Sequence, residues 1–537
     1  METKRRRYHS FVSALRPWHV AAALAASMAC GGSSQGNGTG GNSGSGSAAW
    51  TAGVFAPSST FASQCATPRT GTDPATGKAY PDKPGSTLAE NNWLRSWTHD
   101  LYLWYREVPD LNPASYTTAD YFNVLKTSAT TPSGNPKDKF HFTYPTAQWV
   151  ALSQSGVEAG YGAQWVVIAS RPPRQVVVAY TQPNSPATAP SVNLERGAQV
   201  LTVDGVDLVN ASDSASVDKL NAGLFPSAPG GSHTFSIVDL GATTPRTVTM
   251  VATNVTSTPV QNVETIGRSG TVGYMLFNDH IATAEQQLIA AFGQLQAAGV
   301  SDLMLDIRYN GGGYLDIASE VAYMIAGPGP TTGQGFEKTV FNDKYPSTDP
   351  VTGERLTPTP FHNISQGFSG PQGQALPTLN LSRVFVLTSP NTCSASEAII
   401  NGLRGVGVQV VQIGTTTCGK PYGFYPADNC GTTYFSIEFQ GVNAQGFGDY
   451  PDGFSPANTV SSPGVGLPGC SVADDFSHAL GDPAEGRLAA ALGYRIDQGC
   501  PAATSSTAAT GTARDLSSAD GLAHKSPWRE NRILRRR

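Results

Sequence analysis

Between residues 262 and 413, short apolar runs alternate with longer stretches whose apolar residues recur every three or four positions. The apolar runs lie at 272–276, 302–307, 384–388 and 408–413, and the periodic stretches at 282–298, 315–326 and 396–403. Short apolar runs are typical of strands buried on both faces. Apolar residues that recur every three or four positions, as in the longer stretches, are typical of helices. Strands that alternate with helices form crossover units, so this part of the chain is expected to be a layered α/β sheet.

The sequence around this α/β part divides into further regions. Residues 61–150 are expected to form an N-terminal helical domain, in which Trp93, Trp97, Leu101 and Trp104 would share one core-facing stripe. Residues 151–258 contain short strands and glycine turns, which indicate a small β domain. The α/β part is assigned residues 259–500. The remaining tail, 501–537, is rich in Ala, Ser and Thr and is expected to be disordered.

The start of the chain has the features of an export signal. A basic run at residues 4–7 precedes an apolar stretch at 20–29, which is too short to span a bilayer but suits a signal peptide. Residues 26–31 resemble a bacterial lipoprotein cleavage site, at which Cys30 would be lipidated. A simple secreted protein and an uncleaved anchor are the alternatives. Residues 1–30 are therefore expected to be a lipoprotein signal peptide, and 31–60 a flexible Gly/Ser linker.

Charge and cysteine content narrow the possible partners. With 35 basic and 40 acidic residues the chain has a net charge of -5, so no basic field predicts nucleic-acid binding. Six cysteines besides Cys30 allow up to three disulfides in an oxidising compartment. Cys418 and Cys430 flank a probable turn, and we predict that they pair. No cysteine or histidine cluster has zinc spacing, so no metal and no organic cofactor are predicted.

The chemistry of the chain is expected where two apolar runs end. Ser394 lies between a buried strand and the start of a helix, where free N–H groups and the helix dipole would stabilise an oxyanion. Lys420 follows the next strand on a glycine-containing turn. A lysine amine sheltered from water can be uncharged near neutral pH and can take the serine proton, so no histidine is required. Three glycines at 311–313 would let the backbone approach a substrate closely, although a purely structural turn explains them equally well.

Residues 151–258 resemble a PDZ domain. The resemblance rests on a glycine-containing loop, on a Ser-Pro-Ala turn at 185–187, and on the hairpin sequence RGAQVLTVDG at 196–205. Domains of this kind bind a peptide as an added strand and hold its terminal carboxylate on backbone N–H groups. The resemblance implies that the carboxylate loop is formed by Gly160, Tyr161, Gly162 and Ala163. A generic small β domain is the alternative.

Three motifs in order, LDIRYNGGG, NTCSASE and IGTTTCGK, resemble the C-terminal processing, or tail-specific, serine proteases. The resemblance covers residues 90–500 and implies a crotonase-like protease core with a PDZ-like domain. It implies that Ser394 is the nucleophile and Lys420 the base, with Glu397 orienting the lysine. The oxyanion donors would be the N–H groups of Ala395 and Gly312, with Gly311 as a close alternative.

Several positions depart from that pattern. Phe424 stands where some members have a glutamine partner of the lysine, Pro421 replaces a usual glycine, and Thr415 replaces a usual glutamate. Cys393 and Cys418 beside the site are not typical. These departures indicate a divergent branch, with a disulfide bracing the lysine loop as one interpretation.

Other candidate nucleophiles have weaker support. The Ser-x-x-Lys sequence at 216–219 has no Lys-Thr-Gly partner motif and is expected on the helix of the PDZ-like domain. His280 has no spacing that ties it to Ser394, and a packed histidine is the simpler interpretation. Cys393 has no nearby histidine, so a buried thiol or a disulfide is preferred.

The sequence therefore predicts a lipid-anchored serine endopeptidase of the bacterial cell envelope, in the outer membrane or periplasm. It would cleave unstructured or C-terminal segments of exported proteins. One alternative is a catalytically silent protein that binds peptides in the PDZ-like groove. Another is a hydrolase of the same fold that acts on a non-peptide ester or amide.

Overall fold

The structure, a computed structural model, describes residues 50–74, 76–267, 271–501 and 532–533. All of the described residues belong to one unit, Trp50–Arg537. The predicted signal peptide, the lipidation site Cys30 and most of the predicted linker lie outside the described residues. Within the described part of the chain, none of the helices combines the length and the apolar character needed to cross a bilayer.

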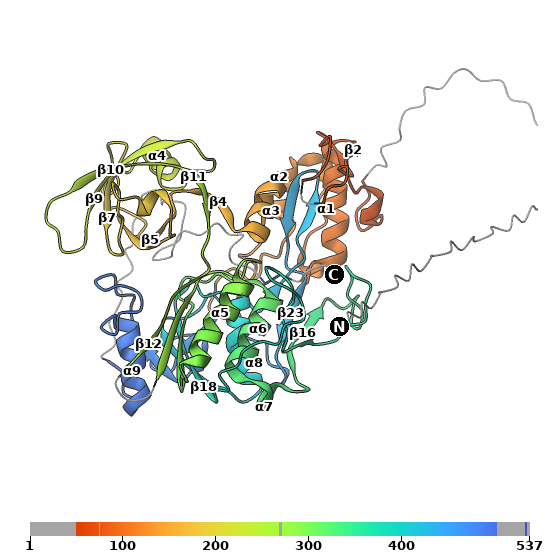
Figure 1. Ribbon diagram of the computed structural model, residues 1–537. Helices are drawn as coiled ribbons and strands as arrows, with labels where there is room; N and C mark the ends of the chain where they lie inside the picture. Colours follow the sequence, from red (N-terminus) through yellow and green to blue (C-terminus); the bar gives the residue numbers. More distant parts are fainter. Residues whose placement is uncertain (1–49, 75, 268–270, 502–531, 534–537) are drawn as a thin grey trace, which may run out of the picture. The chain divides into compact units, whose positions relative to one another are not determined.

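A six-stranded sheet forms the centre of the α/β part (Figure 1). Its strands, in spatial order, are β12 (Val260–Ile266), β13 (Val272–Phe277), β14 (Asp302–Asp306), β18 (Arg383–Thr388), β19 (Gln409–Gly414) and β26 (Gly469–Ser471). Only the β12–β13 pair among these neighbours is antiparallel, and the other pairs are parallel. The carboxyl ends of β14, β18 and β19 consequently lie at one edge of the sheet, where the three motifs begin.

Both faces of this sheet are buried, which explains the unbroken apolar runs in the sequence. One face carries Leu303 and Leu305 and packs against three helices. The other face carries Met304 and packs against the last helix and two strands of the neighbouring domain. The helices of this part are α5 (Ala284–Ala297), α6 (Leu315–Ala326), α7 (Pro328–Thr331), α8 (Ala395–Gly405) and α9 (Gly486–Asp497). The predicted alternation of strands and helices from 272 to 413 is confirmed.

Smaller sheets flank the core. A four-stranded sheet has the order β17 (Thr359–Pro360), β16 (Gly335–Phe341), β23 (Phe439–Val442) and β20 (Tyr422–Gly423). Two further parallel pairs are β24 (Phe454–Pro456) with β25 (Val465–Leu467), and β15 (Gly313–Tyr314) with β27 (Arg532–Ile533).

Residues 157–256 fold around a second sheet with its own apolar core. The predicted boundary at 150/151 falls inside a helix, Thr146–Ser155. Its elements are β5 (Ala163–Ala169), β6 (Gln175–Thr181), β7 (Gln199–Val203), β8 (Val206–Asp207), α4 (Ser214–Leu224), β9 (Ser232–Val238) and β10 (Arg246–Val251). The strands β4 (Val157–Gly160) and β11 (Thr253–Thr256) pair with each other where the chain enters and leaves this domain. The hairpin expected at 196–205 is formed by β7 and β8.

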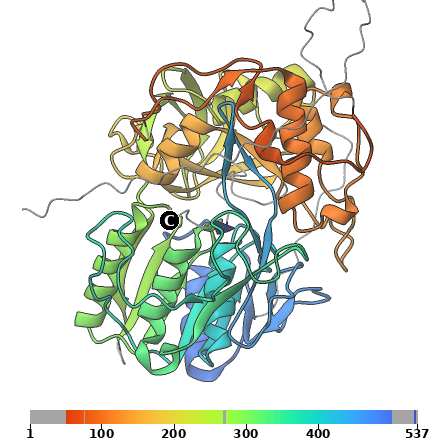
Figure 2. The ribbon, with the colours of Figure 1, turned by 90° about the vertical axis from the view of Figure 1, so that its right-hand side faces the viewer.

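The N-terminal region is held to the α/β part by strand pairing. It contains β1 (Gln64–Cys65), β2 (Lys83–Pro84), α1 (Thr87–Leu101), α2 (Thr118–Val124), β3 (Phe142–Pro145) and α3 (Thr146–Ser155). The hairpin of β21 (Ala427–Asn429) and β22 (Thr432–Phe435) follows the lysine loop and pairs with β3 (Figure 2). The lysine loop is therefore connected directly to the N-terminal region.

Two boundaries differ from the sequence prediction. Residues 50–60, assigned to the linker, pack on α1: the ring of Phe55 stacks on His99 with 3.6 Å between centroids, and Arg95 donates to the carbonyl of Val54. In the tail expected to be disordered, Arg532–Ile533 form strand β27. Helix α1 buries Trp93 and Trp97 but ends before Trp104.

Three disulfides join the six cysteines of the described chain, so the predicted number is confirmed but the predicted pair is wrong. Cys418 bonds Cys393, and Cys430 bonds Cys65 across 365 residues. Cys470 bonds Cys500. Cys430 cannot reach Cys418 because its strand pairing places it beside the N-terminal region rather than beside the lysine loop.

Candidate active site

Ser394 occupies the N-cap position of helix α8, just beyond the carboxyl end of strand β18. Its backbone has φ +60° and ψ -110°, a conformation that residues other than glycine rarely adopt. Strain of this kind persists only where surrounding contacts impose it, and it is concentrated at functional sites. The next residue, Ala395, begins the helix, and a first-turn N–H has no partner within its own helix. The predicted nucleophile therefore lies beside a donor suited to an oxyanion.

Lys420 lies in the loop after strand β19 and is completely buried. Its Nζ is 4.7 Å from the ring centroid of Phe140 and 4.9 Å from that of Phe424. Aromatic faces attract an ammonium group, so the two rings help to hold the end of this side chain in place. Phe424, which replaces the glutamine expected by resemblance, thus contacts the lysine through its ring face.

Glu397 connects the serine loop to the lysine loop. Its Oε2 accepts hydrogen bonds from the backbone N–H groups of both Ser394 (2.9 Å) and Lys420 (2.8 Å). Its Oε1 accepts from the N–H of Gly419 at 2.9 Å and from the hydroxyl of Thr417 at 2.5 Å. Because one oxygen atom binds both backbones, the two loops lie side by side. Glu397 therefore positions both predicted catalytic residues through their main chains.

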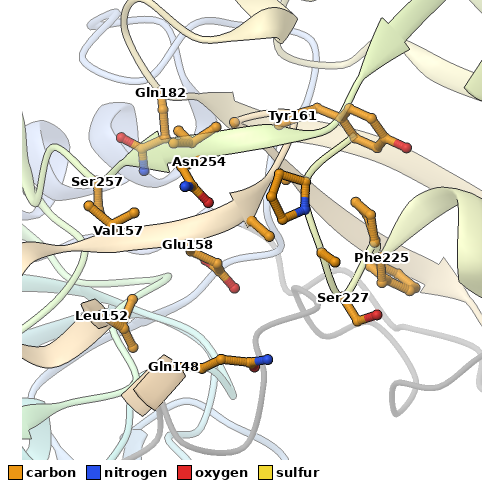
Figure 3. A pocket seen from close by; sticks show the side chains of 18 of the residues that line it. Gln148, Leu152, Val157, Glu158, Tyr161, Gln182, Phe225, Ser227, Asn254 and Ser257 are labelled. Carbon is orange, nitrogen blue, oxygen red and sulfur yellow. The ribbon is translucent and has the colours of Figure 1, made fainter. Parts of the chain in front are cut away.

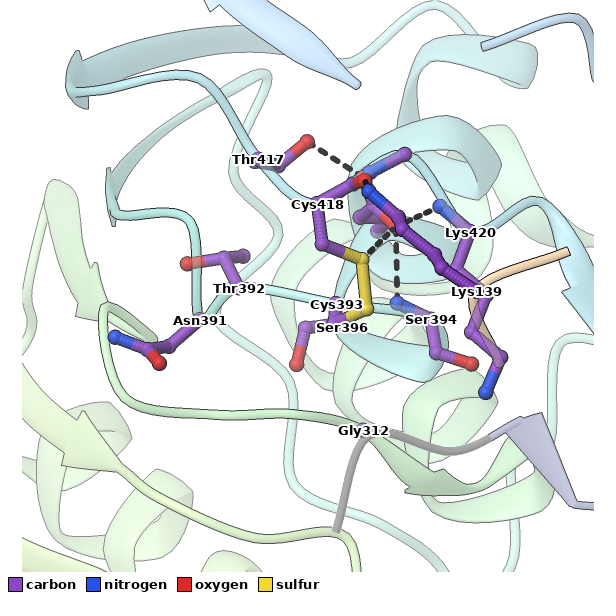
Figure 4. The surroundings of a disulfide bond; sticks show 12 residues. Lys139, Gly312, Asn391, Thr392, Cys393, Ser394, Ser396, Thr417, Cys418 and Lys420 are labelled. Carbon is purple, nitrogen blue, oxygen red and sulfur yellow. Dashed lines mark hydrogen bonds between the residues drawn. A yellow bond between two sulfur atoms is a disulfide. The ribbon is translucent and has the colours of Figure 1, made fainter. Parts of the chain in front are cut away.

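The disulfide between Cys393 and Cys418 joins the same two loops (Figure 4). The Cα atoms of these cysteines are 5.2 Å apart, and the N–H of Cys418 donates to the carbonyl of Thr392 at 3.1 Å. Lys139, from the N-terminal region, donates from Nζ to the carbonyl of Cys418 at 2.9 Å. In Figure 4 the side chains of Ser394 and Lys420 extend toward the same side of the two loops.

Asn310 organises the glycine loop that follows strand β14. Its Oδ1 accepts from the N–H of Gly312 at 3.0 Å and lies 2.9 Å from Nδ1 of His280. Its own carbonyl accepts from the N–H of Cys393 at 3.1 Å and from the hydroxyl of Ser396 at 2.9 Å. The glycine loop therefore lies against the serine loop, with Gly312 on the same side of the sheet as Ser394.

Gly313 shows why this loop needs glycine. Its φ of +139° and its close approach to His280 exclude a side chain, since an added Cβ would lie 2.3 Å from the carbonyl oxygen of His280. The N–H of Tyr314 donates to the same carbonyl at 2.8 Å. His280 is thus a packed residue that supports the loop, as the sequence predicted.

Arg308 anchors the start of the glycine loop through buried ion pairs. It is fully buried and donates to Asp306 (2.9 Å), to Asp474 (2.7 Å) and to Glu485 (2.7 Å). Burial would lower the pKa of Arg308, but the three carboxylates outweigh it and raise the pKa well above its ordinary value. The Asp and Arg of the LDIRYN sequence therefore serve the fold rather than the chemistry.

The loop predicted to bind a carboxylate lines a cavity of about 530 Å³ (Figure 3). All four predicted residues, Gly160, Tyr161, Gly162 and Ala163, lie at its edge, together with residues of α3 and of the segment after α4. The ring of Tyr161 points into the core of the domain and donates to the carbonyl of Gly223 at 2.9 Å. The predicted carboxylate loop therefore forms part of the wall of this cavity.

The rival candidates lie elsewhere or are chemically blocked. The Ser-x-x-Lys sequence at 216–219 lies in the first half of α4, as expected. The sulfur of Cys393 is bonded to Cys418 and is not a thiol nucleophile in this state.

Sequence reasoning missed two contributors to the site. Asn310 was visible in the LDIRYNGGG motif, but nothing in the motif indicated that its side chain binds Gly312. Phe140 lies 280 residues before Lys420 in the chain, and no sequence pattern connected the two.

Comparison with known proteins shows which family this part of the chain resembles. Residues 271–423 match the model of peptidase family S41. A carboxyl-terminal-processing protease of Picosynechococcus sp. (strain ATCC 27264 / PCC 7002 / PR-6) is 28% identical over 171 residues, which are 32% of this chain and 39% of that relative. The match thus spans well under half of the relative's length.

A solved structure assigned to the S41 proteases, from Bacteroides fragilis NCTC 9343, shares the fold. It has a TM-score of 0.56 and 23% sequence identity, over 78% of this chain and 98% of that one. Residues 271–423, which contain Ser394 and Lys420, are therefore similar to peptidase family S41, whose serine peptidases use a Ser–Lys dyad.

Proposed function

We propose that the protein is a serine endopeptidase in which Ser394 is the nucleophile and Lys420 the general base. The observation that carries this proposal is the carboxylate of Glu397, whose one oxygen atom accepts from the backbones of both residues. Two loops separated in the sequence are thereby held together at the carboxyl edge of a parallel sheet, where α/β enzymes place their active sites. The match to a family that uses this dyad supports the same assignment.

The reaction follows from these positions. Uncharged Lys420 accepts the proton of the Ser394 hydroxyl as the oxygen attacks the peptide carbonyl. The resulting lysine ammonium donates that proton to the leaving amine, and an acyl-enzyme remains. Lys420 then takes a proton from water as that water attacks the ester, and it returns the proton to the oxygen of Ser394 when the acid product leaves.

The N–H groups of Ala395 and Gly312 are the proposed oxyanion donors. Ala395 begins a helix whose dipole favours negative charge at this end. The N–H of Gly312 donates to Oδ1 of Asn310 in this structure. We infer that the developing oxyanion takes over this hydrogen bond, so that Asn310 holds the donor in place until the substrate arrives.

The proposed substrates are unstructured or C-terminal segments of proteins. The cavity beside Gly160–Ala163 supports this, because a loop that presents backbone N–H groups can hold a terminal carboxylate. Similarity to a carboxyl-terminal-processing protease over part of the chain supports the same substrate class.

The test is hydrolysis of an unfolded protein by the full chain and by Ser394→Ala and Lys420→Ala variants. Each variant is expected to lose roughly a thousandfold or more in kcat, since members of a catalytic unit act together. Equal rates for the wild type and Ser394→Ala would replace this proposal with that of a silent peptide-binding protein. Cleavage of an ester panel without peptide cleavage would favour a non-peptide hydrolase.

We further propose that the protein is exported to the bacterial cell envelope and anchored by a lipid on Cys30. Three disulfides are in keeping with an oxidising compartment. Metabolic labelling with a fatty acid should mark the wild type and not Cys30→Ala. Equal labelling of both chains would remove the lipid anchor from the proposal.

A further inference from the structure

A short strand from the end of the chain lies between the two walls of the active site. Strand β27, Arg532–Ile533, pairs in parallel with β15, so that Gly313 faces Arg532 and Tyr314 faces Ile533. Ile533 also forms a parallel bridge with Phe424 on the opposite side. One neighbour of β27 thus directly follows the proposed oxyanion donor Gly312, and the other lies four residues after the proposed base.

The side chain of Ile533 fills an apolar pocket at this place. It is only 2% exposed and belongs to a buried cluster that contains Cys393, Phe140, Phe424 and Trp149. The small cavity that remains beside it, of about 10 Å³, is lined among others by Leu152, His280, Gly312 and Gly313. The pocket therefore accommodates a branched aliphatic side chain with little space left, and a charged side chain would lose its hydration there.

The catalytic pair is closed to solvent in the same arrangement. Both Ser394 and Lys420 have 0% of their surface exposed. A protein substrate must reach Ser394 as an extended segment, and the main-chain groups of β15 that could pair with it are already used by β27. Substrate and β27 cannot occupy this strand position together.

We propose that the edge of β15 is a binding site for an extended peptide with a branched aliphatic side chain, and that the protein's own C-terminal segment, through Ile533, occupies it. This inference rests on the proposed function and deepens it by naming the class of segment that the cleft accepts. Because the segment belongs to the same chain, it competes with substrate as a tethered ligand at high effective concentration.

The first experiment compares the full-length wild type with Ile533→Asp in the hydrolysis of an unfolded protein at low substrate concentration. Ile533→Asp is expected to be about tenfold faster, because the loss of one buried aliphatic contact shifts a binding equilibrium by at least that factor. Ile533→Ala should change the rate in the same direction by less. Ile496→Asp, at a position that is 79% exposed, is the matched control and should leave the rate unchanged.

The second experiment measures binding without cleavage. A fluorescent peptide with the sequence of residues 526–537 is titrated into full-length protein that carries both Ser394→Ala and Ile533→Asp. Saturable binding is expected, and the same peptide carrying Ile533→Asp should bind at least tenfold more weakly.

The two experiments separate the inference from the function on which it rests. Peptide binding without hydrolysis by any variant would remove the proposed peptidase activity and keep the binding site. Hydrolysis that is unaffected by Ile533→Asp and Ile533→Ala, together with no difference between the two peptides, would overturn the inference and make β27 a structural strand.

Discussion

At the scale of single residues, Glu397 has the largest predicted effect apart from the dyad. Its two oxygens accept four hydrogen bonds from the serine and lysine loops. Glu397→Gln replaces one acceptor oxygen by an NH2 group, which would face N–H or O–H donors of the two loops and cannot accept their hydrogen bonds. The loops should therefore separate. We expect kcat to fall by about a hundredfold, the size of effect that follows from a misplacement of about 1 Å. Steady-state kinetics measures this.

A second buried glutamate provides the control for that substitution. Glu285 accepts backbone N–H groups of Gln366, Gly367 and Ser369, far from the dyad loops in the sequence. Glu285→Gln should lower the melting temperature by an amount similar to that for Glu397→Gln, with kcat unchanged. If both variants lose activity in proportion to stability, Glu397 has only a structural role.

Individual residues also show what sequence can and cannot predict about a site. Ser394, Lys420 and Glu397 were predicted because each stands in a short motif whose spacing is fixed by one loop. Phe140 was not identified, because its contact with Lys420 depends on how the N-terminal region packs against the β21–β22 hairpin. A contact between distant segments leaves no local pattern in either of them.

At the scale of elements, the Cys393–Cys418 disulfide is expected to stabilise the site as well as the fold. It closes a segment of 25 residues that contains α8 and β19. Removal of a disulfide that closes a loop of this length costs about 3 kcal/mol in the chain-entropy account. The Cys393→Ala/Cys418→Ala variant should therefore lose that stability in urea unfolding. Its kcat should also fall, because the covalent connection between the two catalytic loops is lost.

The Cys470–Cys500 disulfide is a matched comparison, since it closes a similar segment of 30 residues away from the dyad. Cys470→Ala/Cys500→Ala should lose a similar amount of stability with kcat unchanged. An equal loss of kcat in both double variants would contradict a specific role for the disulfide at the active site.

Elements were predicted well where a period repeats and poorly where pairing depends on the tertiary fold. Helix α6 begins and ends at the residues expected from its apolar period. The Cys418–Cys430 pairing failed because closeness in sequence does not determine which strand a cysteine accompanies. Strand β27 could not be expected from a two-residue apolar segment, since its pairing is supplied entirely by β15 and Phe424.

At the scale of the whole molecule, Asp474 links the small β domain, residues 157–256, to the α/β part of the chain. It accepts from Arg196 of the former and from Arg308 of the latter, each at 2.7 Å. Burial would raise the pKa of Asp474, but the guanidinium groups of Arg487, Arg308 and Arg196 lower it well below its ordinary value. The charged form is therefore the one that the folded protein stabilises.

A lowered pKa in the folded state gives a defined dependence on pH. The stabilisation is present above the pKa of about 4 that an unfolded aspartate has, and it is lost as pH falls further. Asp474→Asn should lower the free energy of unfolding at pH 7 by about 3 kcal/mol or more. The difference from wild type should narrow below about pH 4, as measured by urea unfolding at both pH values.

The exposed pair of Asp343 with Arg106 serves as the comparison for Asp474. Solvent screens such a pair, so Asp343→Asn should change stability little at either pH. A difference for Asp474→Asn that stays constant from pH 7 to pH 3 would contradict the proposed origin of its stabilisation.

Leu152 of helix α3 lines both the large cavity beside Gly160–Ala163 and the small one beside Ile533. One short helix is thus a shared wall of two compartments. A ligand that shifts this helix when it binds in one cavity therefore also changes the dimensions of the other cavity. Thermodynamic linkage makes such an effect reciprocal. If a ligand in one cavity raises the affinity of the other cavity for a second ligand, the second ligand raises the affinity for the first by the same factor.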